Sequence, residues 1–444
     1  MILDVENEYI REHILDGYFG LEKESLRVLG NGMFSHTLHP FPEDEHIVKD
    51  FCENQTEINT SVHSSVKAAV EELTFHNQRI YKKLQELPQK EYLWPFSNPP
   101  YIAKEQDIPV AVFEGMHVSK TAYRDYLAEK YGRYKMTFSG IHVNFSFSDE
   151  LIKASYMEQK NQQNKVETAS LQNGGDDFQE YKNNVYLTLA RRLAAYGWIL
   201  VAVTAASPII DSSFVEKGIY GKDIFTGMAS VRCSEMGYWN EFAPIFNYDS
   251  IASYVESIQK YVDNGLLKEP SELYYPIRLK PKGENHLHAL RENGVNHIEL
   301  RMFDLNPLTK SGVEEKDIVF AQLLMIWLLA IPDQSFTERE QIQAVQNFKN
   351  AARYDLKTVR ITTSDGENCS VAKAAMKVID KMKRFYEDIN LPVQDILEFE
   401  YNKFVEGQNR YAWQIREKFQ TGYVKKVLEL AKERQEESCV NCLE

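Results

Sequence analysis

Short segments in which polar and apolar residues alternate predict the strands of this protein. In residues 141–147 the four apolar side chains share one face of a strand, whereas His142 and Asn144 point to the other face. In the later stretch His-Ile-Glu-Leu-Arg-Met the same alternation places Glu299 and Arg301 together on the polar face. Such strands pack one face on a core and leave the other polar, so we expect a ligand-accessible sheet face.

Two further predicted strands carry carboxylates. Residues 55–59 alternate in the same way, with Glu57 on the polar side. Residues 21–28 differ, because Glu22 and Glu24 fall on the same face as the two apolar residues that follow them. Unpaired carboxylates are costly to bury, so we expect a positive group or ion to meet them.

Helical periodicity dominates other parts of the chain. It predicts helices over residues 64–87, 179–204 and 317–329, and from 370 through 432. The Gln- and Asn-rich stretch 157–177 predicts a polar excursion between a strand and a helix. Regular strand–helix repeats, which would indicate a doubly wound nucleotide-binding fold, are not found. The predicted fold class is therefore α+β, with an antiparallel or mixed sheet.

Composition and charge argue against some classes of binding partner. The 444 residues include 51 Lys and Arg against 65 Asp and Glu, a formal net charge of −14, which argues against nucleic acid as a partner. Residues 193–210 are interrupted by polar residues and proline, and 318–331 are too short to cross a bilayer, so we expect buried helices and no membrane partner. The N-terminus has no signal-peptide pattern, and the five cysteines are too few for a disulfide framework. These features predict a cytoplasmic protein.

No repeat and no long linker divides the chain, so we expect residues 1–444 to form a single catalytic domain. Cys439 and Cys442 form a C-x-x-C near the end, but no second pair or neighbouring His completes a metal site. We interpret that pair as part of a solvated tail. The sequence leaves the oligomeric state open, with a monomer as the working expectation.

If the four strands are neighbours, their polar faces converge on a metal site. Several carboxylates within a few ångströms cannot all stay ionised without a cation. Mg²⁺ prefers oxygen ligands, and Mn²⁺ also accepts an imidazole beside them. Zinc is less expected, because no His-x-x-x-His or cysteine spacing typical of it occurs. A single Glu-x-Glu is more often a solvated strand edge, so the prediction depends on the pattern recurring on four strands. The candidate ligands are Glu22, Glu24, Asp50, Glu57, His142 and Glu299.

Basic residues supply the second half of the predicted site. The guanidinium groups of Arg232 and Arg301 suit carboxylate or phosphate, and Arg278 and Lys280 lie in a further candidate stretch. Carboxylates for a metal beside arginines for an anion are typical of phosphoryl transfer, here without a P-loop motif. The residues alone predict a polyvalent-cation site for a phosphate-bearing ligand.

Seven motifs, in order along residues 12–330, resemble the bacterial glutamate-cysteine ligase family. The motifs are residues 20–28, 50–51 with Glu57, 138–146, 206–208, Arg232 with 236–238, 272–278 and 298–307. The resemblance implies a fold related to glutamine synthetase, in which a curved antiparallel sheet forms a funnel for Mg²⁺ and ATP and helices pack on its outer face. It also implies activation of the γ-carboxylate of glutamate by ATP, followed by attack of the amine of cysteine. The product would be γ-glutamylcysteine, in the first step of glutathione biosynthesis.

The resemblance also implies residue roles. The six candidate ligands named above correspond to metal ligands, and Arg301 corresponds to the residue that meets the transferred phosphoryl group. Arg232 and Asn144 correspond to residues that hold glutamate or its phosphorylated form. The pocket for cysteine corresponds to Phe51, Tyr123, Leu127, Tyr238 and Tyr274.

Two departures from the family pattern matter. Met136 stands where some members have Gln, which leaves the specificity for the amine open. Some relatives continue into an ATP-grasp domain that adds glycine, whereas this chain ends at Glu444 after a helical region, 370–444, so we expect the dipeptide as product. Three alternatives stay open: a γ-glutamyl ligase for another small amine, a non-catalytic metal or nucleotide sensor, and a metal-dependent amidase acting on γ-glutamyl compounds without ATP.

Overall fold

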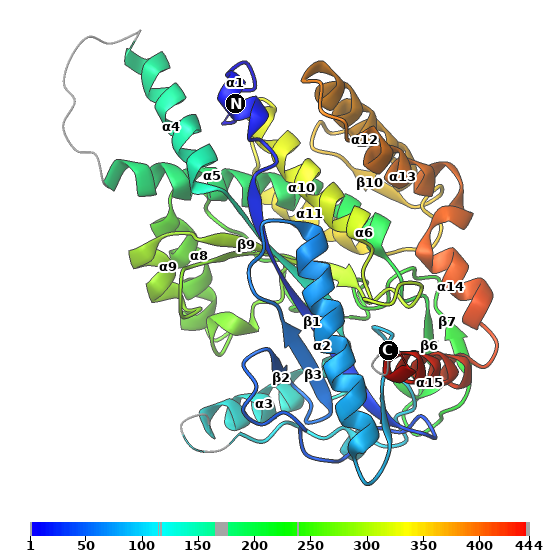
Figure 1. Ribbon diagram of the computed structural model, residues 1–444. Helices are drawn as coiled ribbons and strands as arrows, with labels where there is room; N and C mark the ends of the chain where they lie inside the picture. The colour runs from blue at the N-terminus through cyan, green and yellow to red at the C-terminus, as the bar shows by residue number, and fades with distance from the viewer. Residues whose placement is uncertain (1, 114, 116–117, 165–175, 238, 441–444) are drawn as a thin grey trace.

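An antiparallel sheet forms the centre of the protein (Figure 1). The structure, a computed structural model, describes residues 2–113, 115, 118–164, 176–237 and 239–440. Every strand pairing in this sheet is antiparallel, which confirms the α+β class and decides between the antiparallel and mixed alternatives. The order across the sheet is β2 (Ile47–Lys49), β3 (Gln55–Asn59), β1 (Gly17–Leu29), β5 (Gly140–Phe147), β9 (His297–Asp304) and β8 (Ile277–Lys280), with β4 (Glu91–Leu93) paired to the end of β1.

Two small antiparallel hairpins lie apart from this sheet. They are β6 (Ile209–Asp211) with β7 (Asp223–Phe225), and β10 (Arg360–Thr362) with β11 (Asn368–Ser370).

Helices make up most of the remaining chain. They are α1 (Glu8–Glu12), α2 (Val66–Glu86), α3 (Val118–Tyr131), α4 (Asp149–Asn164), α5 (Asp176–Tyr196), α6 (Trp198–Thr204), α7 (Ser212–Val215), α8 (Ile251–Asp263), α9 (Leu287–Asn293), α10 (Glu315–Ala330), α11 (Glu338–Ala351), α12 (Val371–Asp388), α13 (Gln394–Val405), α14 (Tyr411–Phe419) and α15 (Tyr423–Val440). The 3₁₀ turns whose bounds lie wholly in the described residues include Glu105–Asp107, Lys135–Thr137, Pro270–Glu272 and Gly407–Asn409.

The four predicted helical regions contain the expected helices, and residues 370–432 are divided among α12, α13, α14 and α15. The helix predicted over 179–204 is divided at Gly197 into α5 and α6. The polar excursion predicted from residue 157 is wrong in its first part, because α4 continues to Asn164. Gln and Asn are compatible with a helix whose other face is buried, so composition alone misplaced this boundary. The following residues, 165–175, lie outside the described part of the chain.

Helices cover one face of the sheet. Residues Leu21, Val143 and Leu300 lie on that face and belong to a large apolar core with residues of α2, α5, α6 and α10. Figure 1 shows α2 lying along β1 on this side. The predicted burial of the apolar side of these strands is thereby confirmed, and it leaves the opposite side of the sheet for the site.

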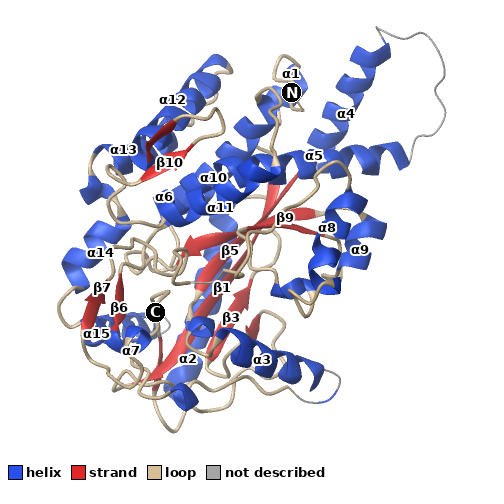
Figure 2. Ribbon diagram, turned by 180° about the vertical axis from the view of Figure 1, so that it is seen from behind, coloured by secondary structure: helices blue, strands red, loops and turns tan. Residues whose placement is uncertain are grey.

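The opposite side is apolar at one end and polar at the other. Leu26 and Val28 belong to a second core with Phe51, Leu127 and Met136. Glu22 and Glu24 are on the same face of the strand as Leu26 and Val28. Figure 2 shows α3, the helix that carries Leu127, in front of β3 on this side.

The C-terminal helices pack along the edge of the molecule and against α2. Helices α12 and α13 pack together and against α10, whereas α15 contacts α2 and β4. A buried ion pair joins Lys403 Nζ of α13 to Asp317 Oδ1 of α10 at 2.7 Å. Among the described residues, no single helix is long and apolar enough to cross a membrane, and α5 with α6 passes that test only as a pair bent by 59°.

Candidate active site

A cavity of about 260 Å³ opens on the polar side of the sheet. It brings together twelve of the fourteen residues predicted for the site, from strands β1, β3, β5 and β9, helix α3 and the loops between them. Those twelve are Glu22, Glu24, Asp50, Phe51, Glu57, Tyr123, Leu127, His142, Arg232, Tyr274, Glu299 and Arg301. Of the other two, Asn144 lies just beside the cavity, and Tyr238 lies outside the described residues.

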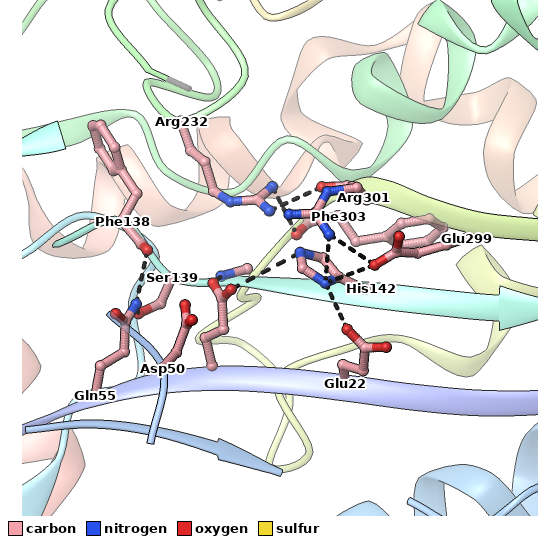
Figure 3. Close-up of polar contacts among 12 residues, drawn as sticks. Glu22, Asp50, Gln55, Phe138, Ser139, His142, Arg232, Glu299, Arg301 and Phe303 are labelled. Atoms are coloured by element: carbon pink, nitrogen blue, oxygen red, sulfur yellow. Dashed lines mark hydrogen bonds and ion pairs between the residues drawn. The ribbon is translucent and has the colours of Figure 1, made fainter. Parts of the chain in front are cut away.

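His142 is at the centre of the polar groups, between Glu22 of β1 and Glu299 of β9 (Figure 3). Its Nδ1 lies 2.9 Å from Glu22 Oε2 and 3.4 Å from Glu299 Oε1. The antiparallel register places Glu22 directly opposite His142, so neighbouring backbones fix this contact. Burial and Arg301 oppose a charge on the imidazole, but hydrogen bonds to the two carboxylates raise the pKa of His142 overall.

Glu24, Glu57 and Asp50 form a second group of acids at the same site. Glu24 Oε2 accepts a hydrogen bond from the backbone N–H of Gly140 at 2.8 Å. Burial raises the pKa of Glu24, and burial together with the nearby Asp50 raises the pKa of Glu57 well above its ordinary value. Asp50 is paired with Arg124 Nη2 of α3 at 2.9 Å. Glu24 Oε1 lies farther from its partner, at 3.9 Å from His142 Nε2.

The donor set fits a divalent cation. One ligand atom from each of Glu22, His142 and Glu299 lies within 4.8 Å of the others. Within the described part of the chain, His142 Nε2 and Glu299 Oε2 are buried without a hydrogen-bond partner. Glu299 Oε2 lies 3.3 Å from Lys280 Nζ, whereas His142 Nε2 lies 3.9 Å from Glu24 Oε1. Buried polar atoms are normally satisfied, so an unpartnered imidazole nitrogen beside a further carboxylate fits a divalent-cation site.

Arg301 is aimed at the acids by a β-bulge. Ile141 pairs with Phe303 and Val143 with Leu300, so Arg301 and Met302 together face His142 alone. Bulges of this kind redirect a side chain at the edge of a site. Arg301 Nη1 donates a hydrogen bond to Glu299 Oε1 at 2.7 Å. Burial alone would raise the pKa of Glu299, but Arg301 and Lys280 hold it well below its usual range.

Arg232 supports the backbone of this bulge. Its Nη2 donates to the carbonyl oxygen of Arg301 at 2.8 Å, and its Nη1 donates to that of Phe303 at 3.3 Å. The guanidinium therefore fixes the backbone that carries Arg301 while it also lines the cavity (Figure 3). Asp304 anchors the same region, because its buried carboxylate accepts hydrogen bonds from Ser207 and Ser230 at 2.7 and 3.0 Å.

Asn144 contacts an acid of the site and does not line the cavity. Its side-chain amide donates to Glu22 Oε1 at 2.9 Å. The amide thus fixes the orientation of the Glu22 carboxylate that also contacts His142. A direct role for Asn144 in holding glutamate stays a prediction.

An aromatic wall closes the other end of the cavity. Tyr123 and Leu127 reach it from α3, and Tyr274 reaches it from the loop before β8. The buried thioether of Met136 lines the same cavity, so the departure noted in the sequence lies inside the site. Burial raises the pKa of Tyr274 far above its ordinary value, so this phenol stays neutral.

A buried carboxylate joins the two halves of this wall. Glu272, which precedes Tyr274, accepts hydrogen bonds from Lys130 and Tyr131 of α3 at 2.5 and 2.7 Å. Asn240 bridges the same segments, since its amide donates to the Glu272 carbonyl at 2.9 Å and accepts from Tyr274 N–H at 2.8 Å. Glu272 and Asn240 therefore hold α3 against the loop that carries Tyr274.

Several cavity residues were not singled out from the sequence. They are Arg124, Trp239, Ser271, Tyr275 and Phe348, and they reach the cavity from segments without strand alternation. Arg278 and Lys280, named only as anion-binding candidates, also line it. Burial and the nearby Arg301 lower the pKa of Arg278 to about 10, which still leaves its guanidinium charged at neutral pH.

Comparison with known proteins places this cavity in a family. The family model for glutamate-cysteine ligase matches residues 2–266 and 260–351. The glutathione biosynthesis bifunctional protein GshAB of Listeria innocua is 32% identical over 450 residues, which cover 98% of this chain and 56% of that protein. The GshAB of Clostridium perfringens is 33% identical over 356 residues, or 77% of this chain and 44% of the relative. The chain thus spans about half the length of the curated relatives it matches.

Solved structures show the same fold. A bifunctional glutathione synthetase from Pasteurella multocida superposes with a TM-score of 0.81 at 25% identity, covering 99% of this chain and 55% of the other. The glutamate-cysteine ligase of Francisella tularensis, solved in complex with AMP, gives a TM-score of 0.80 at 21% identity and covers 95% and 89%. The family match, the relatives and the shared fold agree with the motifs and the cavity. The chain belongs to the glutamate-cysteine ligase family.

Proposed function

We propose that this chain joins the γ-carboxylate of L-glutamate to the amine of L-cysteine, with ATP as co-substrate, and releases γ-glutamylcysteine, ADP and phosphate in the cytoplasm. One observation carries the proposal: Glu22, His142 and Glu299 converge with Arg301 in one cavity that also has an apolar, aromatic end. The polar end suits a metal-bound triphosphate, and the apolar end suits a small side chain such as that of cysteine.

The carboxylate-rich end of the cavity would hold Mg²⁺, with Mn²⁺ as the alternative. The residues that would hold it are Glu22, Glu24, Asp50, Glu57, His142 and Glu299. When bound, the ion offsets negative charge on the triphosphate while the γ-phosphoryl group is transferred.

Phosphoryl transfer to glutamate is the first step. A γ-carboxylate oxygen attacks the γ-phosphorus of ATP, the bond to ADP breaks, and γ-glutamyl phosphate forms. Arg301 is placed to donate hydrogen bonds to the phosphoryl oxygens, because the bulge in β9 turns its guanidinium toward the acids. Arg278, charged and beside it in the cavity, adds a second positive group.

Amide formation is the second step. The uncharged amine of cysteine attacks the γ-carbonyl carbon, phosphate leaves with the bonding electrons, and the amine loses a proton. Phe51, Leu127 and Met136 form a buried apolar surface at this end of the cavity, which favours a small, polarizable thiol side chain. Arg232 and Asn144 would keep glutamate in place through the groups that they position.

The proposal is tested by following ADP release from the purified chain with Mg²⁺ and ATP. ADP should form rapidly only when glutamate and cysteine are both present. Release that does not depend on cysteine would contradict a ligase, an absence of turnover would favour the sensor, and hydrolysis of γ-glutamyl compounds without ATP would favour the amidase.

A second candidate is a γ-glutamyl ligase for another small amine. Met136 favours it, because a thioether at the cavity wall offers no hydrogen-bond donor to the incoming side chain. Competition among cysteine, 2-aminobutyrate and alanine decides between the two. Equal use of 2-aminobutyrate and cysteine would show that the thiol is not recognised.

We further propose that residues 1–444 act as one catalytic unit and as a monomer. The predicted site residues from β1, β3, β5, β9 and α3 meet in one cavity, which supports a single catalytic unit. Light scattering on the active protein tests this, and a dimer that loses activity on dilution would contradict it.

A further inference from the structure

A cluster of histidines and one glutamate lies on the side of the sheet away from the cavity. His46 precedes β2, His63 lies between β3 and α2, and Glu72 and His76 are one turn apart on α2. None of the four lines the cavity described above. One ligand atom from each of His46, Glu72 and His76 lies within 4.8 Å of the others.

The backbone holds these side chains in place before any ion binds. The carbonyl oxygen of His46 accepts a hydrogen bond from Asn59 N–H at 2.7 Å, at the outer end of the β2–β3 pair. His63 exchanges two backbone hydrogen bonds with Phe19 of β1, at 2.7 and 2.9 Å. Helix α2 then begins after the Ser65 cap, so all three segments are fixed relative to one another.

The ligand atoms of this cluster are hydrogen-bonded mainly to one another and to their neighbours. The Glu72 carboxylate also accepts hydrogen bonds from the backbone N–H and the hydroxyl of Ser61, at 2.9 and 3.0 Å. His46 Nδ1 lies 2.8 Å from the carbonyl oxygen of Asn59, which can only accept, so Nδ1 carries the proton and the lone pair of Nε2 is free. His63 Nε2 lies 2.5 Å from Glu72 Oε2, and His76 Nε2 lies 3.3 Å from Glu72 Oε1. Histidine and carboxylate ligands steadied by such neighbours are typical of protein metal sites.

We propose that His46, Glu72 and His76 bind one divalent transition-metal ion of the zinc type, with His63 orienting the Glu72 carboxylate. Two imidazoles and a carboxylate favour Zn²⁺ or Co²⁺ over Mg²⁺, which prefers an all-oxygen shell. The partial exposure of His46 and Glu72 leaves room for water as a further ligand. The ion would tie the β2–β3 hairpin to α2, and that hairpin carries Asp50 and Glu57 of the active site.

One local rearrangement accompanies binding. Arg79 Nη1 lies 3.0 Å from His76 Nδ1, and an arginine can only donate, so the ring proton is on Nε2 in the structure. Metal binding at Nε2 requires this proton to move to Nδ1 and Arg79 to turn away. Arg79 keeps a partner when it does so, because its Nη2 is paired with Asp44.

The test is a Zn²⁺ titration of the full chain against a chromophoric chelator, with Mg²⁺ present in excess to occupy the active-site carboxylates. We expect each chain to bind one Zn²⁺ ion tightly, and we expect the Tm of the protein to be higher when the ion is bound. His46→Asn and Glu72→Gln should each weaken this binding by about 100-fold or more. Glu71→Gln is the matched control, because Glu71 lies next to Glu72 on α2 but is exposed and paired with Lys67. His142→Asn should still bind this Zn²⁺ ion with unchanged affinity.

Two results would overturn the proposal: Zn²⁺ binding that is unchanged in Glu72→Gln, or binding that is lost in His142→Asn alone. If His46→Asn does not fold, His63→Gln replaces it, and the visible spectrum of bound Co²⁺ provides the readout. That spectrum should change in His63→Gln and stay unchanged in Glu71→Gln. The outcome is independent of the proposed ligase activity, since none of these four residues lies in the cavity.

Discussion

Glu24 of β1 and Glu57 of β3 are direct cross-strand partners, with their α-carbons paired in the antiparallel register. Like charges in directly opposite positions destabilise a sheet. The pKa of each of these carboxyl groups is raised, chiefly by burial. The centre of the sheet therefore stores an unfavourable pairing that a bound cation would relieve.

The first prediction is that Mg²⁺ stabilises the protein more as pH rises. The pKa of Glu57 is raised above 4.5, so between pH 4.5 and that higher pKa the folded chain holds a proton that the unfolded chain has lost. Without metal, the stability of the fold therefore falls as pH increases through this range. Mg²⁺ binds the ionised form. The Tm increment from Mg²⁺ should thus be larger at pH 8 than at pH 5.5, and Glu57→Gln should reduce it. An increment that does not vary with pH would argue against this site.

Arg301→Lys should lower kcat by about 100-fold or more, because lysine keeps the charge but loses the planar pair of donors. The measurement is steady-state turnover with saturating ATP, glutamate and cysteine. Arg353→Lys, at an exposed ion pair with Glu235, serves as the control and should keep full activity. An unchanged kcat in Arg301→Lys would remove Arg301 from contact with the phosphoryl group.

Gly140→Ala should impair catalysis much more than stability. A β-carbon at Gly140 would lie 2.1 Å from Arg232 Nη2, so the guanidinium must move away from the carbonyl oxygens of Arg301 and Phe303. The displaced group is the end of a flexible side chain, and the fold can adapt. Displacements of about 1 Å can cost about 100-fold in rate. We expect a fall in kcat of that order with a Tm within a few degrees of wild type, and normal kcat would show that Arg232 does not position Arg301.

Tyr131→Phe should raise KM for cysteine selectively. The lost hydroxyl donates to Glu272, which holds α3 against the loop that carries Tyr274. Loss of one such hydrogen bond corresponds to about 1–2 kcal/mol, or roughly 10-fold in KM. KM for glutamate and ATP should change little, and Glu272→Asp should retain part of the affinity for cysteine. A uniform rise in all three KM values would indicate general damage to the fold.

Lys23→Met should stabilise the protein at neutral pH. Lys23 is buried behind the site with only Asn77 Oδ1 at 2.9 Å as a hydrogen-bond acceptor, and no carboxylate of the described residues lies within ion-pair distance. Burial lowers the pKa of Lys23 to about 7, so between pH 7 and 10.5 the unfolded chain binds a proton that the folded chain does not. Stability from this group rises with pH across that range. In urea unfolding, the free energy of unfolding of Lys23→Met should exceed that of wild type by about 1–3 kcal/mol at pH 7. This difference should be smaller at pH 9.5. A variant less stable than wild type at pH 7 would contradict this interpretation.

The site could be predicted from local alternation where it lies on strands. Side chains at every second residue share a face, so the alternation predicts that Glu22, His142 and Glu299 meet if their strands are neighbours, and the structure confirms that they do. The shared face of Glu22, Glu24, Leu26 and Val28 was predicted in the same way, but the second core to which Leu26 belongs was not. The alternation of polar and apolar residues does not distinguish a ligase for cysteine from a ligase for another amine, a non-catalytic sensor or an amidase. All four would have the same polar face and would differ only in the reaction that takes place there.

Other features depend on contacts far apart in the sequence. The bulge at Arg301 is a property of two strands, and neither strand shows it alone. The pairing of Arg124 with Asp50 and of Glu272 with Tyr131 needs α3 to fold over the cavity, and the helical pattern of α3 was not singled out. The division at Gly197 and the continuation of α4 likewise follow from packing that a single segment does not reveal.

The most direct test is isotope transfer during a single turnover. Glutamate labelled with ¹⁸O in both γ-carboxylate oxygens is incubated with the chain, Mg²⁺, ATP and cysteine, and the released phosphate is analysed by mass spectrometry. Activation through γ-glutamyl phosphate predicts one ¹⁸O atom in each phosphate, with the other retained in the new amide. Phosphate free of ¹⁸O would show that the γ-carboxylate never receives the phosphoryl group, and the proposed function would be wrong.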